Sequence, residues 1–183
     1  MPLERAQSLW DFAVSLYGHA QVKSCCLSLQ ARADIDVCVL LAVAWLASRG
    51  RLLDSAELQS LLAVASPWRQ QLVLPIRALR NTLRPSNESP QSQQTPLPHS
   101  DIEAMYAQLK NLELDAERRQ LTQMQQWLEN HLLQPARSGP AHASALASGD
   151  CIDANIQCYL SRFAVLKTDT VCETAALFRQ YVN

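Results

Sequence analysis

Length, composition and charge set the first limits on this chain. Its 183 residues are 48% hydrophobic and carry a formal net charge of −1, which argues against wholesale disorder and against a strongly basic nucleic-acid-binding domain. Only four glycines are present, and their spacing excludes glycine-rich phosphate-binding loops. Ala, Leu, Gln and Arg are common whereas Ile, Thr, Phe and Tyr are scarce, so the composition favours helix over strand.

The sequence predicts a cytoplasmic protein without a membrane-spanning segment. Acidic residues occur in the opening MPLERAQSLWDF, where a signal peptide needs a basic and then an apolar segment. The apolar run from Val37 to Ala47 is eleven residues long, whereas a spanning helix needs about 20. We therefore expect the six cysteines to be thiols, because a reducing compartment disfavours disulfides.

Helix signals begin near the N-terminus. Apolar spacing predicts a first helix over residues 4–18, which ends at Gly18, and a second over residues 21–31. Asp36 is the expected N-cap of a third helix over residues 37–49, which closes at Gly50. This third helix is apolar on every side, so we expect other helices to surround it.

Two further helices are predicted before residue 85. Asp54 and Glu57 form a capping box at the start of the fourth helix. Ser66 and Pro67 have the residue types of an N-cap and a first helical position, so we expect a fifth helix to begin there. Pro75 lies inside that helix and predicts a kink.

Residues 85–99 are predicted to be a mobile linker, because they contain four prolines and mostly small polar residues. The longest helix should then run from a capping box at Ser100 and Glu103 to about Leu133. Its expected inward stripe consists of Ile102, Met105, Tyr106, Leu109, Leu112, Ala116, Met124, Trp127 or Leu128, and Leu132.

After a second loop, two last helices should cover residues 152–163 and 171–182, with a capping box at Thr170 and Glu173. The prediction is thus an all-α, single-domain bundle of about seven or eight helices over residues 1–183. Residues 1–84 form helices around the buried helix 37–49, residues 85–99 are the linker, and residues 100–183 are the long helix with C-terminal helices that pack back.

Several different short motifs are spread over most of the chain. They are L-W-x-F at residues 9–12, C-L-x-L-Q at 26–30, D-V at 36–37, W-R at 68–69, R-A-L-R after Pro75, E-L-x-A-E at 113–117, and Asn155 with Tyr159 and Leu160. This pattern resembles an uncharacterised family of short proteobacterial proteins, known only as a conserved domain of unknown function. The resemblance implies a helical fold and no particular activity. Cys38 stands where that family usually has Asn.

The sequence offers no convincing metal or catalytic motif. Cys25 and Cys26 are adjacent, the histidines form no H-E-x-x-H, and no G-x-S-x-G elbow is present. Cys26 and Cys38 are expected to be buried and therefore inert as nucleophiles. Glu113 and Glu117 lie four residues apart as in carboxylate metal sites, but the Glu-x-x-His motifs of such sites are missing. We therefore expect no metal, no cofactor and no catalytic residue.

Charge is distributed unevenly along the chain. Residues 1–85 hold nine Lys or Arg against six Asp or Glu, whereas residues 86–183 hold seven against eleven. Arginines recur on one side of the fifth helix, and acidic residues lie on the long helix. We hypothesise that these two helices pack together, with Arg77 or Arg80 paired to Glu113 or Glu117.

Three functional interpretations follow, of which an unrecognised enzyme is the third and the least favoured. The first is a non-enzymatic cytoplasmic protein that binds an unknown protein partner or forms a homodimer, because a long amphipathic helix can lay its apolar face on a partner. The alternative is a cleft for a small molecule or anion, lined by Arg77, Arg80 and Glu113. Neither membrane nor nucleic-acid binding is expected. The candidate pocket or interaction residues are Arg69, Arg77, Arg80, Glu113, Glu117, Asn155 and Tyr159.

Overall fold

The computed structural model describes residues 7–84, 98–133 and 148–182. Its helices are α1 (Leu9–Tyr17), α2 (Ala20–Ala33), α3 (Val37–Ser48), α4 (Ser55–Trp68), a π turn (Arg69–Val73), α5 (Leu74–Thr82), α6 (His99–His131), α7 (Ser148–Leu160) and α8 (Thr168–Tyr181). No strand occurs in these three stretches, which confirms the all-α prediction. The predicted linker 85–99 falls almost wholly outside them, and so does most of the second predicted loop.

The chain divides into two compact units. The first unit consists of residues 1–65 and 121–183, and the second of residues 66–120. The prediction of one single domain therefore stays a prediction. No helix of the described stretches is both long and apolar enough to cross a membrane.

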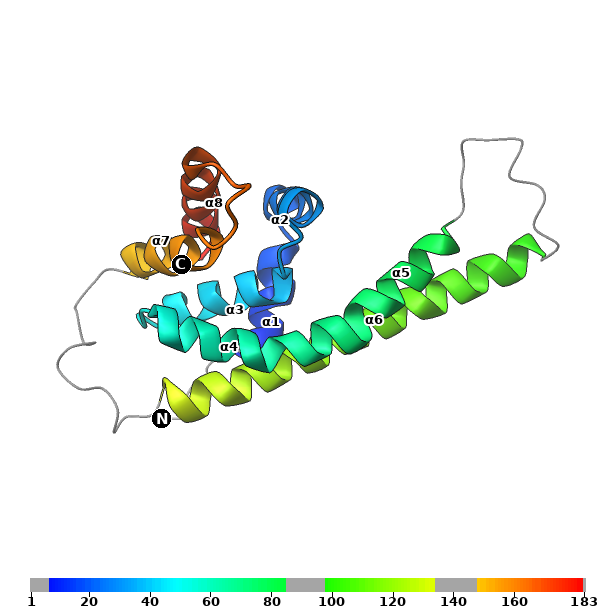
Figure 1. The fold of residues 1–183 in the computed structure, drawn as a ribbon, viewed down its shortest axis with the longest axis horizontal. Coiled ribbons are helices and arrows are strands. Elements are labelled where there is room, and N and C mark those ends of the chain that lie inside the picture. The colour runs from blue at the N-terminus through cyan, green and yellow to red at the C-terminus, as the bar shows by residue number, and fades with distance from the viewer. Residues whose placement is uncertain (1–6, 85–97, 134–147, 183) are drawn as a thin grey trace. The chain divides into compact units, whose positions relative to one another are not determined.

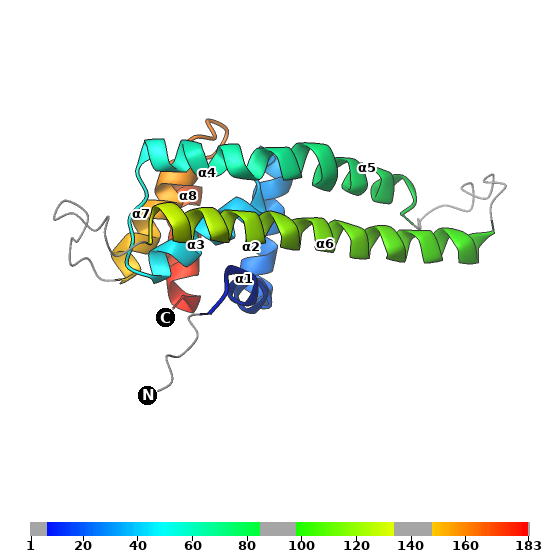
Figure 2. The same ribbon diagram turned by 90° about the horizontal axis from the view of Figure 1, so that it is seen from below.

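Helix α3 forms the centre of the first unit. It packs against α1 and α7, and α7 packs in turn against α8 (Figures 1 and 2). All ten residues from Cys38 to Ala47 are buried, as expected for a helix that is apolar on every side. A fully buried Val or Leu side chain contributes about 1.5–3 kcal/mol, so this helix is a major source of stability.

Side chains and backbone close both ends of α3 as predicted. The carboxylate of Asp36 accepts hydrogen bonds from the backbone N–H groups of Cys38 and Val39, at 2.9 and 3.3 Å. At the other end, Gly50 has φ +70°, a left-handed conformation that glycine adopts without strain. Its N–H donates to the carbonyl of Ala47 at 2.8 Å.

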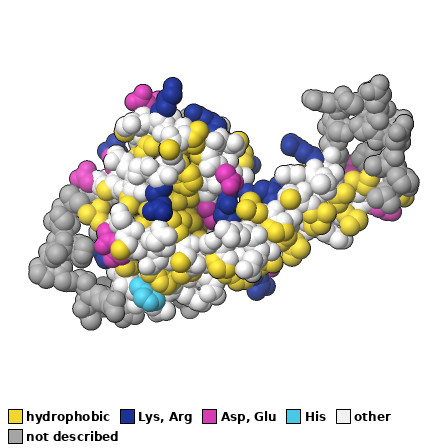
Figure 3. All heavy atoms as spheres, viewed as in Figure 1, with side chains coloured by type: hydrophobic (Ala, Val, Ile, Leu, Met, Phe, Trp, Pro, Cys, Tyr) yellow, Lys and Arg dark blue, Asp and Glu magenta, His cyan; other side chains and the backbone are white. Residues whose placement is uncertain are grey.

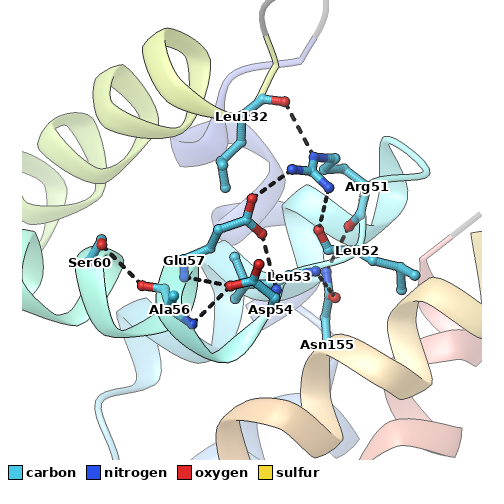
Figure 4. Close-up of polar contacts among 9 residues, drawn as sticks. All are labelled: Arg51, Leu52, Leu53, Asp54, Ala56, Glu57, Ser60, Leu132 and Asn155. Atoms are coloured by element: carbon cyan, nitrogen blue, oxygen red, sulfur yellow. Dashed lines mark hydrogen bonds and ion pairs between the residues drawn. The ribbon is translucent and has the colours of Figure 1, made fainter. Parts of the chain in front are cut away.

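The capping box of α4 is also confirmed (Figure 4). The Asp54 carboxylate accepts from the N–H groups of Ala56 and Glu57, both at 2.8 Å, and Glu57 accepts from the Asp54 N–H at 3.0 Å. Arg51 reinforces this end of the helix with an ion pair to Glu57 at 2.7 Å. The first three of these contacts satisfy backbone N–H groups that a helix start leaves without partners, and the ion pair holds the Glu57 carboxylate in place.

The predicted helix start at Ser66 and Pro67 is wrong. The chain continues as helix through Pro67 and then widens into the π turn, where the Leu74 N–H donates to the carbonyl of Arg69, five residues back. Pro75 follows at the start of α5. A proline ring clashes with the carbonyl four residues before it, so a wide turn before Pro75 gives its ring room.

Two other predicted capping boxes are wrong as well. Helix α6 already begins at His99, with the Asp101 N–H bonded to the Pro98 carbonyl, so Ser100 lies inside the first turn. Helix α8 begins at Thr168, and Thr170 instead accepts, through its carbonyl, a hydrogen bond from the Thr174 hydroxyl at 2.8 Å. The S/T-x-x-E pattern also fits residues in the first turns of a helix that has already started.

We expect Asp36→Ala to lower the free energy of unfolding by about 1 kcal/mol, because it removes the acceptor for two N–H groups at the start of α3. Asp36→Asn keeps an acceptor oxygen and should cost less than Asp36→Ala. Urea denaturation followed by circular dichroism measures both changes. Equal losses for the two variants would contradict the capping role.

Candidate functional site

The second unit is a pair of antiparallel helical segments, α5 with the π turn and the first part of α6, which lie side by side in both ribbon views (Figures 1 and 2). The less exposed residues of α6 recur at alternating steps of four and three. Such spacing places them in one narrow seam, as in a coiled coil. The seam residues of α6 are Ile102, Tyr106, Leu109, Glu113, Ala116 and Gln120. Among the less exposed residues of the other segment, which also include Leu74 and Arg77, we assign Val73, Ile76, Arg80 and Leu83 to the seam because they follow the same spacing.

Charged side chains join the two segments. The Nε of Arg77 donates to Glu113 Oε1 at 2.6 Å, and its Nη2 donates to Glu117 Oε1 at 2.8 Å. The Nε of Arg80 donates to the other oxygen of Glu113 at 2.5 Å. Arg80 also reaches the hydroxyl of Tyr106 at 3.3 Å and lies 5.7 Å from the centre of its ring. These contacts confirm the predicted pairing, and we call these five residues the charge network.

The charge network controls the ionisation of its central carboxylate. Burial alone would raise the pKa of Glu113, but hydrogen bonds from Arg80 and Arg77 and their positive charges outweigh burial and lower that pKa. The hydrogen bond to Glu113 in turn raises the pKa of Arg80. Glu113 is thus an anion at neutral pH that binds both guanidinium groups. The two positive charges of the arginines neutralise the two negative charges of the glutamates.

Asn155 and Tyr159 belong to the first unit, where their side chains hold backbone groups. The fully buried Asn155 accepts from the Leu53 N–H at 2.8 Å and donates to the carbonyl of Arg51 at 2.9 Å (Figure 4). It also donates to the carbonyl of Val43 at 3.2 Å. Tyr159 accepts from the N–H of Asp36 at 3.0 Å and donates to its carbonyl at 3.1 Å. Asn155 thus connects α7 to the middle of α3 and to the segment between α3 and α4, and Tyr159 connects α7 to the start of α3.

Arg69, the last of the candidate residues, lies at the start of the π turn. The structure therefore brings Arg77, Arg80, Glu113 and Glu117 together, whereas Asn155 and Tyr159 serve another part of the chain.

Burial makes three of the cysteines, Cys26, Cys151 and Cys158, poor nucleophiles. Cys26 and Cys38 are buried, as predicted. Burial, with a smaller contribution from neighbouring Cys25, raises the pKa of Cys26 to about 12. Burial also raises the pKa of Cys151 and of Cys158. A thiol with a raised pKa is a poor nucleophile at neutral pH. In the described stretches, no group of three or more His, Cys, Asp or Glu residues could hold a metal ion.

The structure reveals a surface that the sequence analysis missed. Five large apolar side chains of the second unit are exposed: Leu72 by 41%, Leu79 by 52%, Met105 by 52%, and Leu112 and Leu114 by 51% each. The prediction that Met105 and Leu112 point inward is wrong, because the seam of a two-helix pair is narrower than the buried face of a bundle helix. Hydrophobic side chains gather along α5 and α6 in the space-filling view (Figure 3).

Four of these five side chains share one side of the helix pair. Arg77 and Glu117, which meet in an ion pair, each directly follow a seam residue. Four exposed side chains each directly precede a seam residue, and they therefore lie on the side of the helix pair opposite to that ion pair. They are Leu72, Leu79, Met105 and Leu112. We call these four residues the apolar flank. Leu114 is 51% exposed as well, but it points away from Leu112 because two helical steps turn through about 200°.

A family model described as "Protein of unknown function (DUF2390)" matches residues 8–124. The matched stretch contains the whole of the second unit, including the charge network and the apolar flank. No curated protein and no solved structure matches the chain significantly.

We expect Glu113→Gln to weaken the second unit by about 2 kcal/mol, between the ~0.5 kcal/mol of an exposed ion pair and the 3–5 kcal/mol of a fully buried one. The matched control is Asp115→Asn, which removes an exposed ion pair with Arg119 on the same helix and should cost no more than about 0.5 kcal/mol. Hydrogen exchange of the α5 amides measures the local opening free energy. Similar losses for both variants would argue against the charge network.

Acid should weaken the helix pair through the same carboxylate. Because the pKa of Glu113 is lower in the folded chain, its stabilising contribution is complete above the pKa of an unfolded Glu, about 4.3, and is lost as the pH falls through the lower folded value. We expect the unfolding free energy, from urea denaturation between about pH 6 and pH 3, to fall less steeply in Glu113→Gln than in the wild-type chain. Parallel pH profiles would contradict this prediction.

Proposed function

The chain belongs to this family of proteins of unknown function, and from its geometry we propose that it is a non-enzymatic, cytoplasmic helical protein that acts by binding another protein chain. The apolar flank of α5 and α6 is the proposed binding surface. The main support for this proposal is the exposure of four large apolar side chains on one side of the second unit, those of Leu72, Leu79, Met105 and Leu112. Clustered large apolar side chains on a surface are typical of protein–protein contact sites.

The free energy expected from covering the apolar flank indicates that the flank is one part of a larger contact surface. Each side chain of the flank is about half exposed. Covering all four would therefore contribute about 3–6 kcal/mol, from 1.5–3 kcal/mol for each complete burial. Association costs about 4–15 kcal/mol in lost motion, so the flank fits the apolar centre of a larger contact.

The geometry gives less support to the alternative, a cleft for a small molecule or anion. Such a ligand would need the guanidinium groups of Arg77 and Arg80, and both already bind Glu113. An anion from solution would have to displace a carboxylate that the chain itself holds in place. Asn155 is likewise engaged with three backbone groups of the first unit.

We expect Leu112→Glu to weaken partner binding at least about tenfold, because it places a charge in the apolar centre of the contact. The matched control is Leu114→Glu, on the same helix at the same 51% exposure but on another side. The tagged wild-type chain and both variants would be incubated with extract of the native host, and the bound proteins would be quantified by mass spectrometry.

A protein that wild type and Leu114→Glu retain and Leu112→Glu loses supports the proposal, whether it is another protein or an untagged copy of this chain. Identical binding by all three forms would contradict it. Native mass spectrometry of the gently purified chain tests the alternative, since a discrete small-molecule adduct on the monomer would favour a ligand site.

A further inference from the structure

We propose that the partner of the apolar flank is the same flank of a second copy of this chain. The two copies would be related by a two-fold axis that crosses the helices at the level of Leu79 and Leu112. This inference rests on the proposed function and adds the identity of the partner. Two observations support it, the order of the side chains along the flank and the charges beside them, and the size of the surface indicates how tightly the two copies would bind.

The charge network fixes which residues of the two helices lie at the same level. Arg77 contacts Glu113 and Glu117, whereas Arg80 contacts Glu113 and Tyr106. Position 79, between these two arginines and nearer to Arg80, therefore lies level with positions close to 112. Leu79 and Leu112 accordingly form the middle of the flank.

The other two side chains lie at matching distances on either side of that middle. Leu72 is seven residues from Leu79 in one direction, and Met105 is seven residues from Leu112 in the other, because α6 runs antiparallel to α5. Seven residues of helix span about 10 Å. A two-fold axis through the middle level then places Leu72 beside the partner's Met105, and it brings Leu79 and Leu112 onto the same pair in the second copy. Such self-complementarity is what an isologous contact requires.

Charges beside the flank do not oppose this pairing. Pro75 lies between Leu72 and Leu79, Gln108 lies between Met105 and Leu112, and neither carries a charge. Asp115 and Arg119, near one end of the flank, neutralise each other in an ion pair at 3.0 Å. The charges in these rows, Asp101, Asp115 and Arg119, therefore lie toward the ends of the flank, and like charges do not face each other at its middle.

The size of the surface predicts a weak dimer. The flank is about 20 Å long and spans two helices of about 10 Å each, so it covers about 400 Å² per copy. A standard stable interface buries about 800 Å² per partner, and smaller ones are typically transient. The expected product is an antiparallel four-helix arrangement that forms and dissociates with concentration. The seven-residue spacing suits it, because helices that cross at about 20° keep such rows in contact.

Sedimentation velocity of the full-length chain over a wide concentration range tests the proposal. We expect wild type and Leu114→Glu to shift from monomer to dimer as the concentration rises, with a dissociation constant in the micromolar range. Leu112→Glu should dissociate at least about tenfold more readily. Circular dichroism confirms that each variant folds.

A charge exchange then tests whether the contact is between identical surfaces. Leu112→Glu and Leu112→Lys should each be monomeric alone, because like charges would meet at the two-fold axis. An equimolar mixture should regain the dimer. Restored association in the mixture supports a second copy of this chain as the partner of the flank. A mixture that stays monomeric contradicts it.

The outcomes separate this inference from the proposed function. In one outcome the wild-type chain is monomeric at every concentration but binds another protein of the host extract, and Leu112→Glu abolishes that binding. This outcome contradicts the second copy as the partner and leaves the proposed function intact. If the chain is monomeric and the wild type, Leu112→Glu and Leu114→Glu all bind the same host proteins, both this inference and the proposed function are contradicted.

Discussion

The ion pairs of Arg77 and Arg80 with Glu113 and Glu117 are the interaction on which the second unit depends. Few residues of this unit are buried, so apolar packing alone would allow the two helices to slide past each other. A shift of one turn would separate each guanidinium from its carboxylate, and leaving one partner half-buried and unpaired is costly. The charges therefore do what a polar seam residue does in a coiled coil, which is to specify register at some expense of stability.

That register also creates the apolar flank. Leu79 and Leu112 lie side by side only when Arg77 and Arg80 hold Glu113 between them. The first unit shows the opposite arrangement, because α3 is buried on every side and the buried polar groups of Asn155 are bonded to backbone. One unit is thus built around an enclosed helix and exposes Val14, Leu27 and Val165, whereas the other is held by charges and exposes four large apolar side chains along one side. The alignment of those four on one side is why the proposed contact surface lies on the second unit.

Local chemistry made much of the fold predictable from sequence. Asp36 before an apolar run specifies a helix start through its own carboxylate, and arginines and acids at helical spacing on two segments predict that those segments pair. The inward direction assigned to Met105 and Leu112 could not be corrected in the same way. Both residues lie on the apolar arc of α6, and only the partner helix decides how much of that arc is covered. A single facing helix covers a narrow seam, so the steps of four and three between seam residues were the available signal.

The central claim is that the apolar flank is a contact surface which a second copy covers. Solvent relaxation of leucine methyl groups by a soluble paramagnetic agent tests it directly, since Leu112 and Leu114 are equally exposed in one chain. At high protein concentration the methyl groups of Leu79 and Leu112 should become shielded while those of Leu114 stay accessible, and dilution should remove the difference. Equal accessibility of Leu112 and Leu114 at every concentration would contradict it.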